Sequence, residues 1–241
     1  MKSNYQLYDY EKSKDRIDEI LNTSDTSYEE VDEIPNRDKL TFTNGFYVNC
    51  SALFVDIRSS SKLPSKYRRP TLARIYRAYI SEIVALLNGD ENCKEINIHG
   101  DSVWGVFNTP KKIDVDRVFR NAYEIASIVD TLNCKLKKKK IDPIEVGIGI
   151  DYGRALMIKA GYSGSKINEV VWMGEVVNNA SKLCSYGNKT SSDYEIMLSN
   201  AIYNNLKKEN QDFLYWNSNR SCYNGNVTQV GMNAWINENC K

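Results

Sequence analysis

The chain of 241 residues is long enough to form one large domain with a buried core. Hydrophobic residues make up 41% and charged residues 26% of the sequence, which excludes a fibrous or intrinsically disordered protein. The formal net charge is only +1, so no overall field attracts the chain to nucleic acid or to a membrane, and we expect neither as a partner.

The N-terminus and the cysteines bear on the cellular compartment. The first residues, MKSNYQLYDYEKSKDR, lack the apolar segment of a secretory signal, and no apolar run is long enough to cross a bilayer. The six cysteines are scattered and form no CxxC pair, so the sequence predicts neither structural zinc nor a disulfide framework. We therefore expect a cytoplasmic protein with reduced thiols.

The N-terminal part of the chain is polar. Residues 8–22 place a few apolar side chains among many charges, which predicts one surface helix. The polar stretch that follows predicts an irregular arm. We therefore divide the chain into an N-terminal helix and arm, residues 1–39, and a main domain, residues 40–241.

The first half of the main domain alternates strand and helix patterns. Residues 46–57 are rich in β-branched and aromatic side chains, as a buried strand should be. Residues 69–88 carry apolar side chains at helical spacing, with Gly89 as a stop. Residues 94–107 alternate on both sides of Gly100–Asp101, which predicts a hairpin.

The second half continues this alternation. A helix is predicted over about residues 113–136, ending in a basic loop of lysines, and residues 143–160 predict a strand pair around a turn at Asp151–Gly153. A short helix follows Gly174, and strand and helix signals alternate after it. The order β-α-ββ-α-ββ-α-β-α-β predicts an α+β, ferredoxin-like sheet, mainly antiparallel, with helices packed on one face.

Two acidic residues stand at turns of this predicted sheet. Asp56 ends an apolar strand, and Asp101 lies at the tip of the predicted hairpin. If strand and hairpin are neighbours, both carboxylates reach the same edge, where two hard oxygen ligands suit Mg²⁺ or Mn²⁺ and substrate phosphates complete the shell. Taken singly, each carboxylate is better explained as a helix cap or a turn residue.

The segment FVDIRSSS predicts a strand-to-helix turn. The backbone N–H groups of such a turn, at Ser59 and Ser60, can bind phosphate oxygens with help from the helix dipole. Arg58 adds positive charge to the same turn. The motif carries little weight alone, but it lies beside Asp56.

Four motifs in this region resemble the catalytic domain of class III adenylate and guanylate cyclases. FVDIRSSS resembles the metal-binding strand of that family, and IHGDSVWGVF resembles its second metal hairpin. VGIGIDYG is similar to the family's strand turn, and GEVVNNASKL to one of its helices. The motifs stand in the family's order over about residues 50–185, so the resemblance implies a class III nucleotidyl cyclase domain.

The resemblance also implies roles for single residues. Asp56 and Asp101 would hold two divalent metal ions, Mn²⁺ or Mg²⁺, with help from the carbonyl of Ile57. Asn178 would act on the ribose and Lys182 on the developing phosphate charge. The ribose 3′-oxygen would attack the α-phosphorus and expel pyrophosphate. Because the family's sites form between two subunits, the resemblance implies a head-to-tail homodimer with composite sites.

The departures from the family concern phosphate and base recognition. Lys182 stands where the family usually has Arg, which removes bidentate contact with phosphate. The C-terminal part has no obvious counterpart of the family's phosphate-binding KG. Asn97 and Val171 occupy the positions that select the base, and they match neither the adenylate nor the guanylate pattern.

The flanking sequence resembles the pyrimidine cyclases of the bacterial Pycsar antiphage system, over roughly residues 35–110 and the helix near Asn178. The resemblance implies conversion of UTP, or alternatively CTP, into a cyclic nucleotide that a separate effector senses in antiviral defence. An (R/Y)xxR pattern associated with the base pocket is matched by Arg74 and Arg77. Tyr67, Arg68 and Arg69 are the alternative.

Other functions are less well supported. His99 is the only histidine, so a Ser-His-Asp or Cys-His site has no other base, and we interpret it as a packed or rim residue. The GG(D/E)EF hairpin of diguanylate cyclases is absent, since the tip reads HGDS. An adenylate or guanylate cyclase, or a catalytically dead nucleotide sensor, stays an alternative. The intact pair Asp56 and Asp101 argues against the dead sensor.

Overall fold

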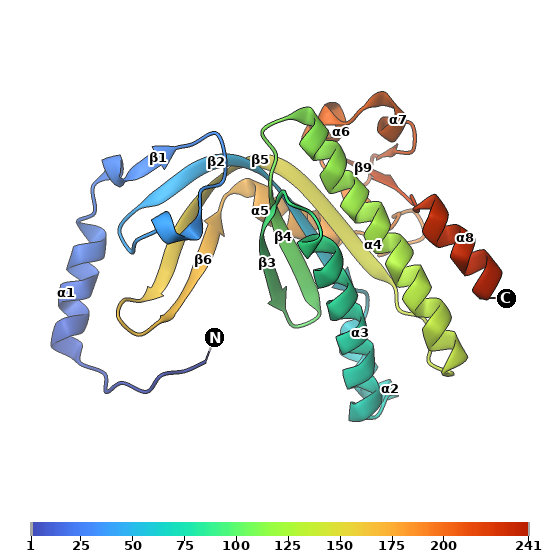
Figure 1. The fold of residues 1–241 in the computed structure, drawn as a ribbon, viewed down its shortest axis with the longest axis horizontal. Helices are drawn as coiled ribbons and strands as arrows, with labels where there is room; N and C mark the ends of the chain where they lie inside the picture. The colour runs from blue at the N-terminus through green and yellow to red at the C-terminus, as the bar shows by residue number, and fades with distance from the viewer. Residues whose placement is uncertain (1, 241) are drawn as a thin grey trace.

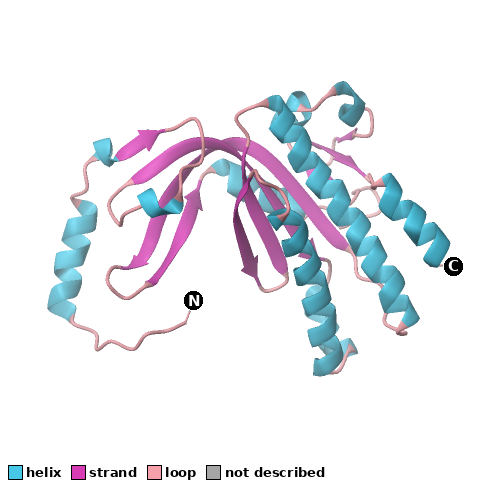
Figure 2. Cartoon of the chain, viewed as in Figure 1, coloured by secondary structure: helices cyan, strands magenta, loops and turns pink. Residues whose placement is uncertain are grey.

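The structure is a computed structural model that describes residues 2–240 (Figure 1). Its helices, coloured in Figure 2, are α1 (Tyr10–Leu21), α2 (Leu63–Lys66), α3 (Arg69–Asn88), α4 (Lys112–Lys138), α5 (Glu175–Cys184), α6 (Asn200–Asn205), α7 (Lys208–Gln211) and α8 (Val230–Asn239), with 3-10 turns η1 (Asp25–Ser27), η2 (Arg37–Lys39) and η3 (Ser60–Lys62). Its strands are β1 (Tyr28–Glu30), β2 (Gly45–Ile57), β3 (Cys93–His99), β4 (Ser102–Asn108), β5 (Val146–Tyr162), β6 (Ile167–Met173), β7 (Ile196–Leu198), β8 (Tyr215–Asn217) and β9 (Cys222–Gly225).

All of these strands belong to one mixed sheet. Its main order is β3-β4-β2-β5-β7-β9-β8, with β1 beside β2 and β6 beside β5. The pairs β1–β2 and β5–β7 are parallel, and the other pairs are antiparallel. The long strands β2 and β5 pair from Gly45–Ile158 to Ile57–Val146 and arch through the molecule (Figure 1). The predicted α+β, mainly antiparallel fold is confirmed.

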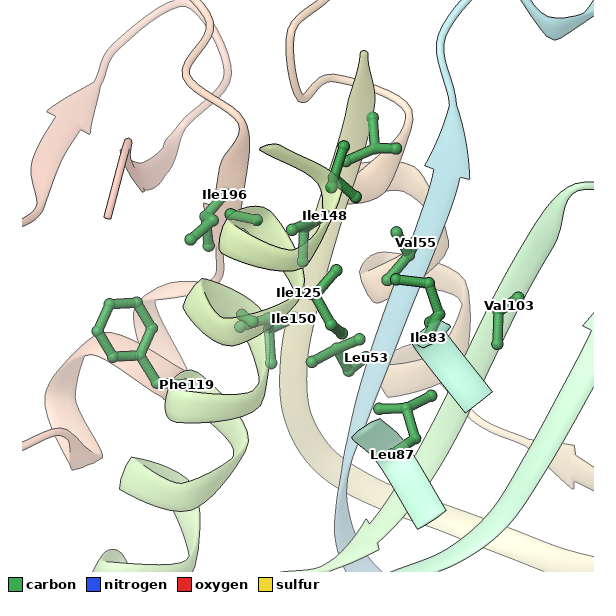
Figure 3. Packing of buried hydrophobic residues seen from close by; sticks show 14 of the residues in the cluster. Leu53, Val55, Ile83, Leu87, Val103, Phe119, Ile125, Ile148, Ile150 and Ile196 are labelled. Carbon is green, nitrogen blue, oxygen red and sulfur yellow. The ribbon is translucent and has the colours of Figure 1, made fainter. Parts of the chain in front are cut away.

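One face of the sheet packs against α3 and α4. Because side chains alternate along a strand, Leu53 and Val55 of β2 point to the same face, and Ile148 and Ile150 of β5 join them. Figure 3 shows these side chains meeting those of the two helices. The helix α3 contributes residues spaced by four, namely Ile75, Tyr79, Ile83 and Leu87.

The helix α5 lies on the opposite face, so the expectation that helices pack on one face is wrong. Gly147 and Gly149 of β5 allow this close approach. A Cβ atom built at Gly149 would lie 2.1 Å from the carbonyl oxygen of Ala180 and from the backbone nitrogen of Cys184. The glycines therefore serve helix packing.

The predicted turn at Asp151–Gly153 is also wrong, because β5 continues through these residues. They pair with residues 50–52 of β2. The carboxylate of Asp151 accepts a hydrogen bond from the N–H of Tyr152 at 2.8 Å, within an extended strand. The chain reverses later, between β5 and β6, and β6 was missed by the sequence analysis.

The N-terminal segment is partly integrated into the sheet. The helix α1 has no buried residue, but the stretch expected to be irregular contains β1. Ile34 and Leu40 are buried in a hydrophobic cluster that also contains Val176 and Ala180 of α5, and the N–H of Ile34 donates to the side chain of Asn108 at 2.9 Å. The segment before β2 therefore covers one face of the sheet. A separate unit over residues 1–39 stays a prediction.

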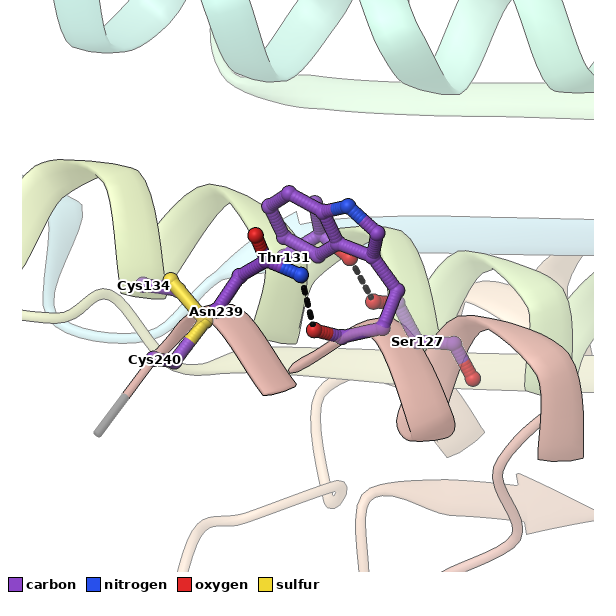
Figure 4. Close-up of a disulfide and its surroundings, with 6 residues drawn as sticks. Ser127, Thr131, Cys134, Asn239 and Cys240 are labelled. Atoms are coloured by element: carbon purple, nitrogen blue, oxygen red, sulfur yellow. Dashed lines mark hydrogen bonds between the residues drawn. A yellow bond between two sulfur atoms is a disulfide. The ribbon is translucent and has the colours of Figure 1, made fainter. Parts of the chain in front are cut away.

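The C-terminal helix α8 is attached to α4 by a disulfide between Cys134 and Cys240 (Figure 4). The expectation of reduced thiols is wrong for this pair, because packing of α8 on α4 brings together residues 106 positions apart, which no local spacing reveals. The other cysteines among residues 2–240 are free.

The helix α4 also runs through Lys138, so three of the lysines expected in a loop are helical.

No helix among residues 2–240 combines the length and the apolar character needed to cross a membrane.

Candidate active site

Asp56 and Asp101 meet at one edge of the sheet. Val55 of β2 pairs with Val103 of β4, so the end of β2 lies beside the turn that carries Asp101. Burial and, after it, the nearby carboxylate of Asp101 together raise the pKa of Asp56 to about 6, against the opposing effect of Arg58. Two carboxylates that repel each other in this way could together hold a cation.

One carboxylate oxygen of Asp101 lacks a partner among the described residues. Its Oδ2 atom is buried and accepts no hydrogen bond from residues 2–240. A buried carboxylate oxygen is usually paired, because desolvation without a partner destabilises the fold. Oδ2 of Asp101 could therefore bind a cation or accept a hydrogen bond from another donor.

Arg58 is held inward beside this pair. Its guanidinium donates to Oδ2 of Asp56 at 3.1 Å and to the carbonyl of Ser185 at 3.0 Å. Its backbone N–H donates to Glu145 at 2.7 Å and is therefore not free for phosphate. Arg58 thus links the end of β2 to the end of α5.

The chain turns sharply after Arg58. Ser59 has a left-handed backbone with φ of 53°, and Ser60 begins the 3-10 turn η3. The predicted strand-to-helix turn is therefore present at the position where phosphates are expected. Ile57, directly before it, has a buried side chain and pairs with Val146.

A cavity of about 380 Å³ opens next to Asp56. Phe54 and Trp104 form its aromatic wall, with ring centroids 4.9 Å apart and an angle of 4° between the rings. The cavity lies between the sheet and α5 and is lined by Phe54, Asp56, His99, Ser102, Trp104, Ser181, Cys184 and Ser185. His99 is an exposed rim residue here, as expected from the sequence.

Asn178 and Lys182 are exposed on α5, one helical turn apart. They are not among the residues that line the cavity of Asp56. Ser181 and Ser185 of the same helix do line it. One chain therefore presents the carboxylates and the pair Asn178 and Lys182 at separate positions.

Asn97 and Val171 lie on different strands, β3 and β6. The Nδ2 atom of Asn97 is buried and has no hydrogen-bond partner among residues 2–240, whereas the side chain of Val171 is exposed. Arg37 of η2 spans the space between these strands, with ion pairs to Glu95 at 3.9 Å and to Glu169 at 3.7 Å.

The sequence profile of the Adenylate and Guanylate cyclase catalytic domain matches residues 43–234. The chain belongs to this cyclase family. The match includes the Asp56–Asp101 edge, the cavity and α5.

Relatives of this cyclase domain align along most of its length. A protein named Uridylate cyclase from Gulbenkiania mobilis is 44% identical over 99% of this chain and 100% of its own length. A second Uridylate cyclase, from Treponema porcinum, is 37% identical over 96% of this chain and 82% of its own. A Cytidylate cyclase from Staphylococcus aureus is 31% identical over 66% of this chain and 38% of its own.

Solved cyclase structures share the fold. An adenylyl cyclase from P. aeruginosa superposes with a TM-score of 0.61 and 20% identity, over 71% of this chain and 85% of that one. A guanylyl cyclase superposes with a TM-score of 0.61 and 19% identity, over 72% and 84% of the two chains. The α+β cyclase fold is thereby confirmed independently of the motifs.

The arginines predicted for the base pocket of the cyclase lie elsewhere in the single chain. Arg74 and Arg77 are on the exposed side of α3, and Arg74 donates to Thr71 at 3.1 Å. The alternative Tyr67 donates to the carboxylate of Asp142 at 2.8 Å and accepts from its N–H at 3.0 Å. Tyr67 is thus already engaged in holding the chain together. Arg69 is the first residue of α3, and Arg68 directly precedes it as the N-cap.

Sequence reasoning missed two groups near the cyclase site. The hydroxyl of Tyr79 is buried without a partner among residues 2–240, and burial raises its pKa, with the neighbouring Cys184, Asp56 and Asp101 adding to this effect. In the sequence, Tyr79 is one of the apolar residues at helical spacing over residues 69–88, a pattern that indicates a core or dimer contact. Arg37 was missed because it lay in the presumed arm, although Glu95, two residues before Asn97, marks the strand face that Arg37 contacts.

Proposed function

We propose that this cyclase domain is a uridylate cyclase, a lyase that converts UTP into 3′,5′-cyclic UMP and pyrophosphate. The observation that carries the proposal is the 44% identity to a Uridylate cyclase over 99% of this chain. The proposal includes a cytoplasmic role in antiviral defence, in which a separate effector senses the product. That part depends on the resemblance to the Pycsar cyclases.

The carboxylate pair fits two divalent metal ions, Mn²⁺ or Mg²⁺. Asp56 and Asp101 are hard oxygen ligands, and Oδ2 of Asp101 is buried without a partner among the described residues. Within residues 2–240 no group of three or more His, Cys, Asp or Glu is placed to hold a metal ion. The carbonyl of Ile57 and the substrate phosphates would therefore complete the coordination. Bound ions would lower the pKa of the ribose 3′-hydroxyl and neutralise the triphosphate.

The protein's own residues would orient the substrate for an in-line attack. The turn at Ser59 and Ser60 would receive the phosphates, and Arg58 would hold Asp56 in place. Asn178 would position the ribose. Lys182 would stabilise the charge that develops on the phosphate in the transition state, which is where stabilisation accelerates the step.

The separation of these groups in one chain supports a composite site. Asn178 and Lys182 are exposed on α5 and do not line the cavity of Asp56. In a head-to-tail homodimer, α5 of one subunit would complete the site formed by the carboxylates of the other. Arg74 and Arg77, also exposed, would approach the base from a second subunit.

The second candidate is a cytidylate cyclase, favoured by the 31% identity to a Cytidylate cyclase over 66% of this chain. Asn97 can serve either pyrimidine, because an amide both donates and accepts hydrogen bonds. A purine is disfavoured because Asn97 and Val171 match neither the adenylate nor the guanylate pattern at the positions that select the base.

The proposal is tested by incubating the purified protein with one nucleoside triphosphate at a time and Mn²⁺, then identifying products by mass. Cyclic UMP and pyrophosphate from UTP, abolished by EDTA, are the expected result. Turnover of CTP alone would favour the second candidate. Nucleotide binding without turnover of any triphosphate would overturn the enzymatic function in favour of a sensor.

A further inference from the structure

Arg37 joins two strands that are distant in the sheet order. Its Nε atom lies 3.9 Å from Oε1 of Glu95 on β3, and one terminal nitrogen lies 3.7 Å from Oε1 of Glu169 on β6. Both distances exceed those of hydrogen bonds, so the guanidinium and the two carboxylates can each still form a hydrogen bond with another group. The side chain of Arg37 is 52% exposed, while that of Glu95 is only 11% exposed.

A row of polar side chains follows one face of β3. His99, Asn97 and Glu95 alternate along the strand and therefore point the same way. His99 lines the cavity beside Asp56, and Glu95 lines a second cavity of about 370 Å³ together with Ile34, Pro35, Asn36, Arg37 and Lys94. The row thus leads from the carboxylate pair to Arg37.

The row contains a buried donor that nothing satisfies. The Nδ2 atom of Asn97 is inaccessible to solvent and has no partner among residues 2–240. An unpaired buried amide destabilises a fold and calls for a ligand or an ordered water. Asn97, Glu95 and Arg37 together present a donor, an acceptor and a donor in that order.

We propose that Glu95, oriented by Arg37, reads the uracil ring together with Asn97. This proposal rests on the proposed function. Uracil presents a carbonyl, the N3–H group and a second carbonyl along one edge, which is acceptor, donor and acceptor. Glu95 accepts from N3–H, and Asn97 and Arg37 donate to the flanking carbonyl oxygens. Glu95 and Asn97 are specificity-determining residues that touch the base.

The same arrangement disfavours cytosine. At the central position cytosine carries an unprotonated N3, whose lone pair faces the carboxylate of Glu95 instead of donating to it. A site built around a hydrogen bond discriminates strongly against an analogue that lacks the corresponding group, because its own buried group is left unpaired. The residues therefore select UTP over CTP.

The test compares Glu95→Gln with a matched control, Glu91→Gln. Glu91 precedes β3, is 80% exposed and pairs with Arg117 at 3.0 Å, so the control removes the same charge from an arginine pair outside the row. Glu95→Gln is expected to lower the ratio of kcat/KM for UTP to that for CTP by about tenfold or more, because an amide can also donate to cytosine N3. The control is expected to leave the ratio unchanged.

Binding provides a second readout that does not require turnover. The probes are 3′-deoxy-UTP and 3′-deoxy-CTP, which lack the attacking hydroxyl, and calorimetry gives their dissociation constants. Glu95→Gln should narrow the difference between the dissociation constants of the two probes. Arg37→Met should weaken the binding of 3′-deoxy-UTP, and Arg37→Lys should recover part of that affinity. Melting temperatures of the variants establish that each is folded.

If Glu95→Gln does not fold, Asn97→Asp provides a second test, because asparagine and aspartate side chains have nearly the same shape. The substitution replaces a donor to a uracil carbonyl by an acceptor for the cytosine amino group. The value of kcat/KM should therefore fall more for UTP than for CTP. Folded variants with the wild-type preference for UTP would overturn this inference and leave the uridylate cyclase standing. A wild-type protein that cyclises no UTP would overturn both.

Discussion

Asp56 and Asp101 lie close enough to repel each other. The pKa of Asp56 is raised to about 6 by burial and by Asp101, so the folded protein retains a proton on Asp56 that the unfolded chain has released. Between about pH 4 and pH 6, this difference lowers the stability of the metal-free protein as pH rises. The arrangement is therefore unfavourable in the absence of a cation.

Asp101→Asn should accordingly have opposite effects on stability and activity. In EDTA, the variant should melt at a higher temperature than the wild type at about pH 7, with a smaller difference at about pH 4, because it removes repulsion that exists only when both groups are ionised. Cyclisation should be abolished. Thermal melts and product assays measure the two effects, and a fully active variant would contradict the role given to Asp101.

Asp56 and Asp101 could be predicted as neighbours because a ferredoxin-like sheet places the strand that ends near Asp56 beside the hairpin that carries Asp101, and β2 does pair with β4. Arg37 could not. The position of Arg37 between Glu95 and Glu169 depends on how β3 and β6 lie relative to each other in space. These strands are far apart in the sequence, so no local pattern reveals the contact.

At the scale of elements, α5 is placed by the glycines of β5. A Cβ at Gly149 would lie 2.1 Å from backbone atoms of α5, whereas a Cβ at Gly153 would meet only the Cβ of Val176 at 3.5 Å. Gly149→Ala should therefore displace α5 and cause loss of activity and of several °C in melting temperature. Gly153→Ala is the matched control and should stay close to wild type. Equal behaviour of the two variants would argue against this packing role.

The disulfide Cys134–Cys240 fixes α8 on α4, where the N–H of Gln229 also donates to Ser127 at 2.7 Å. Cys240→Ser should lower the free energy of unfolding by about 2–4 kcal/mol, because the unfolded chain gains freedom. Reductant should destabilise the wild type by the same amount and leave the variant unchanged in urea titrations. A wild type indifferent to reductant would show that the bond is absent in solution.

The helices and the first strands were predictable because their apolar spacing is local. Local patterns mislead where a longer-range contact decides the structure. The segment around Asp151 contains turn-forming residues, yet pairing with β2 keeps it extended. Cys134 and Cys240 carry no local signature, and only the packing of α8 reveals the pair.

At the scale of the whole molecule, the exposed position of Asn178 and Lys182 suggests that two chains are needed. Lys182→Ala alone should lower kcat by about 100-fold or more, as expected for loss of a group that stabilises transition-state charge. Mixing inactive Asp56→Asn with Lys182→Ala subunits should restore roughly one quarter of wild-type activity, because half of the dimers are mixed and have one intact site each. Mixtures no more active than their components would contradict a composite site.

In the function proposed above, the enzyme selects a pyrimidine, and UTP in particular. The most direct measurement is a competition in which UTP, CTP, ATP and GTP are present at equal concentration with Mn²⁺, and all cyclic products are quantified by mass spectrometry. The structure and the relatives of the chain predict cyclic UMP as the main product, formed only while metal is present. Cyclic AMP or cyclic GMP as the main product would contradict the selection of a pyrimidine, although the assignment to the cyclase family would still stand.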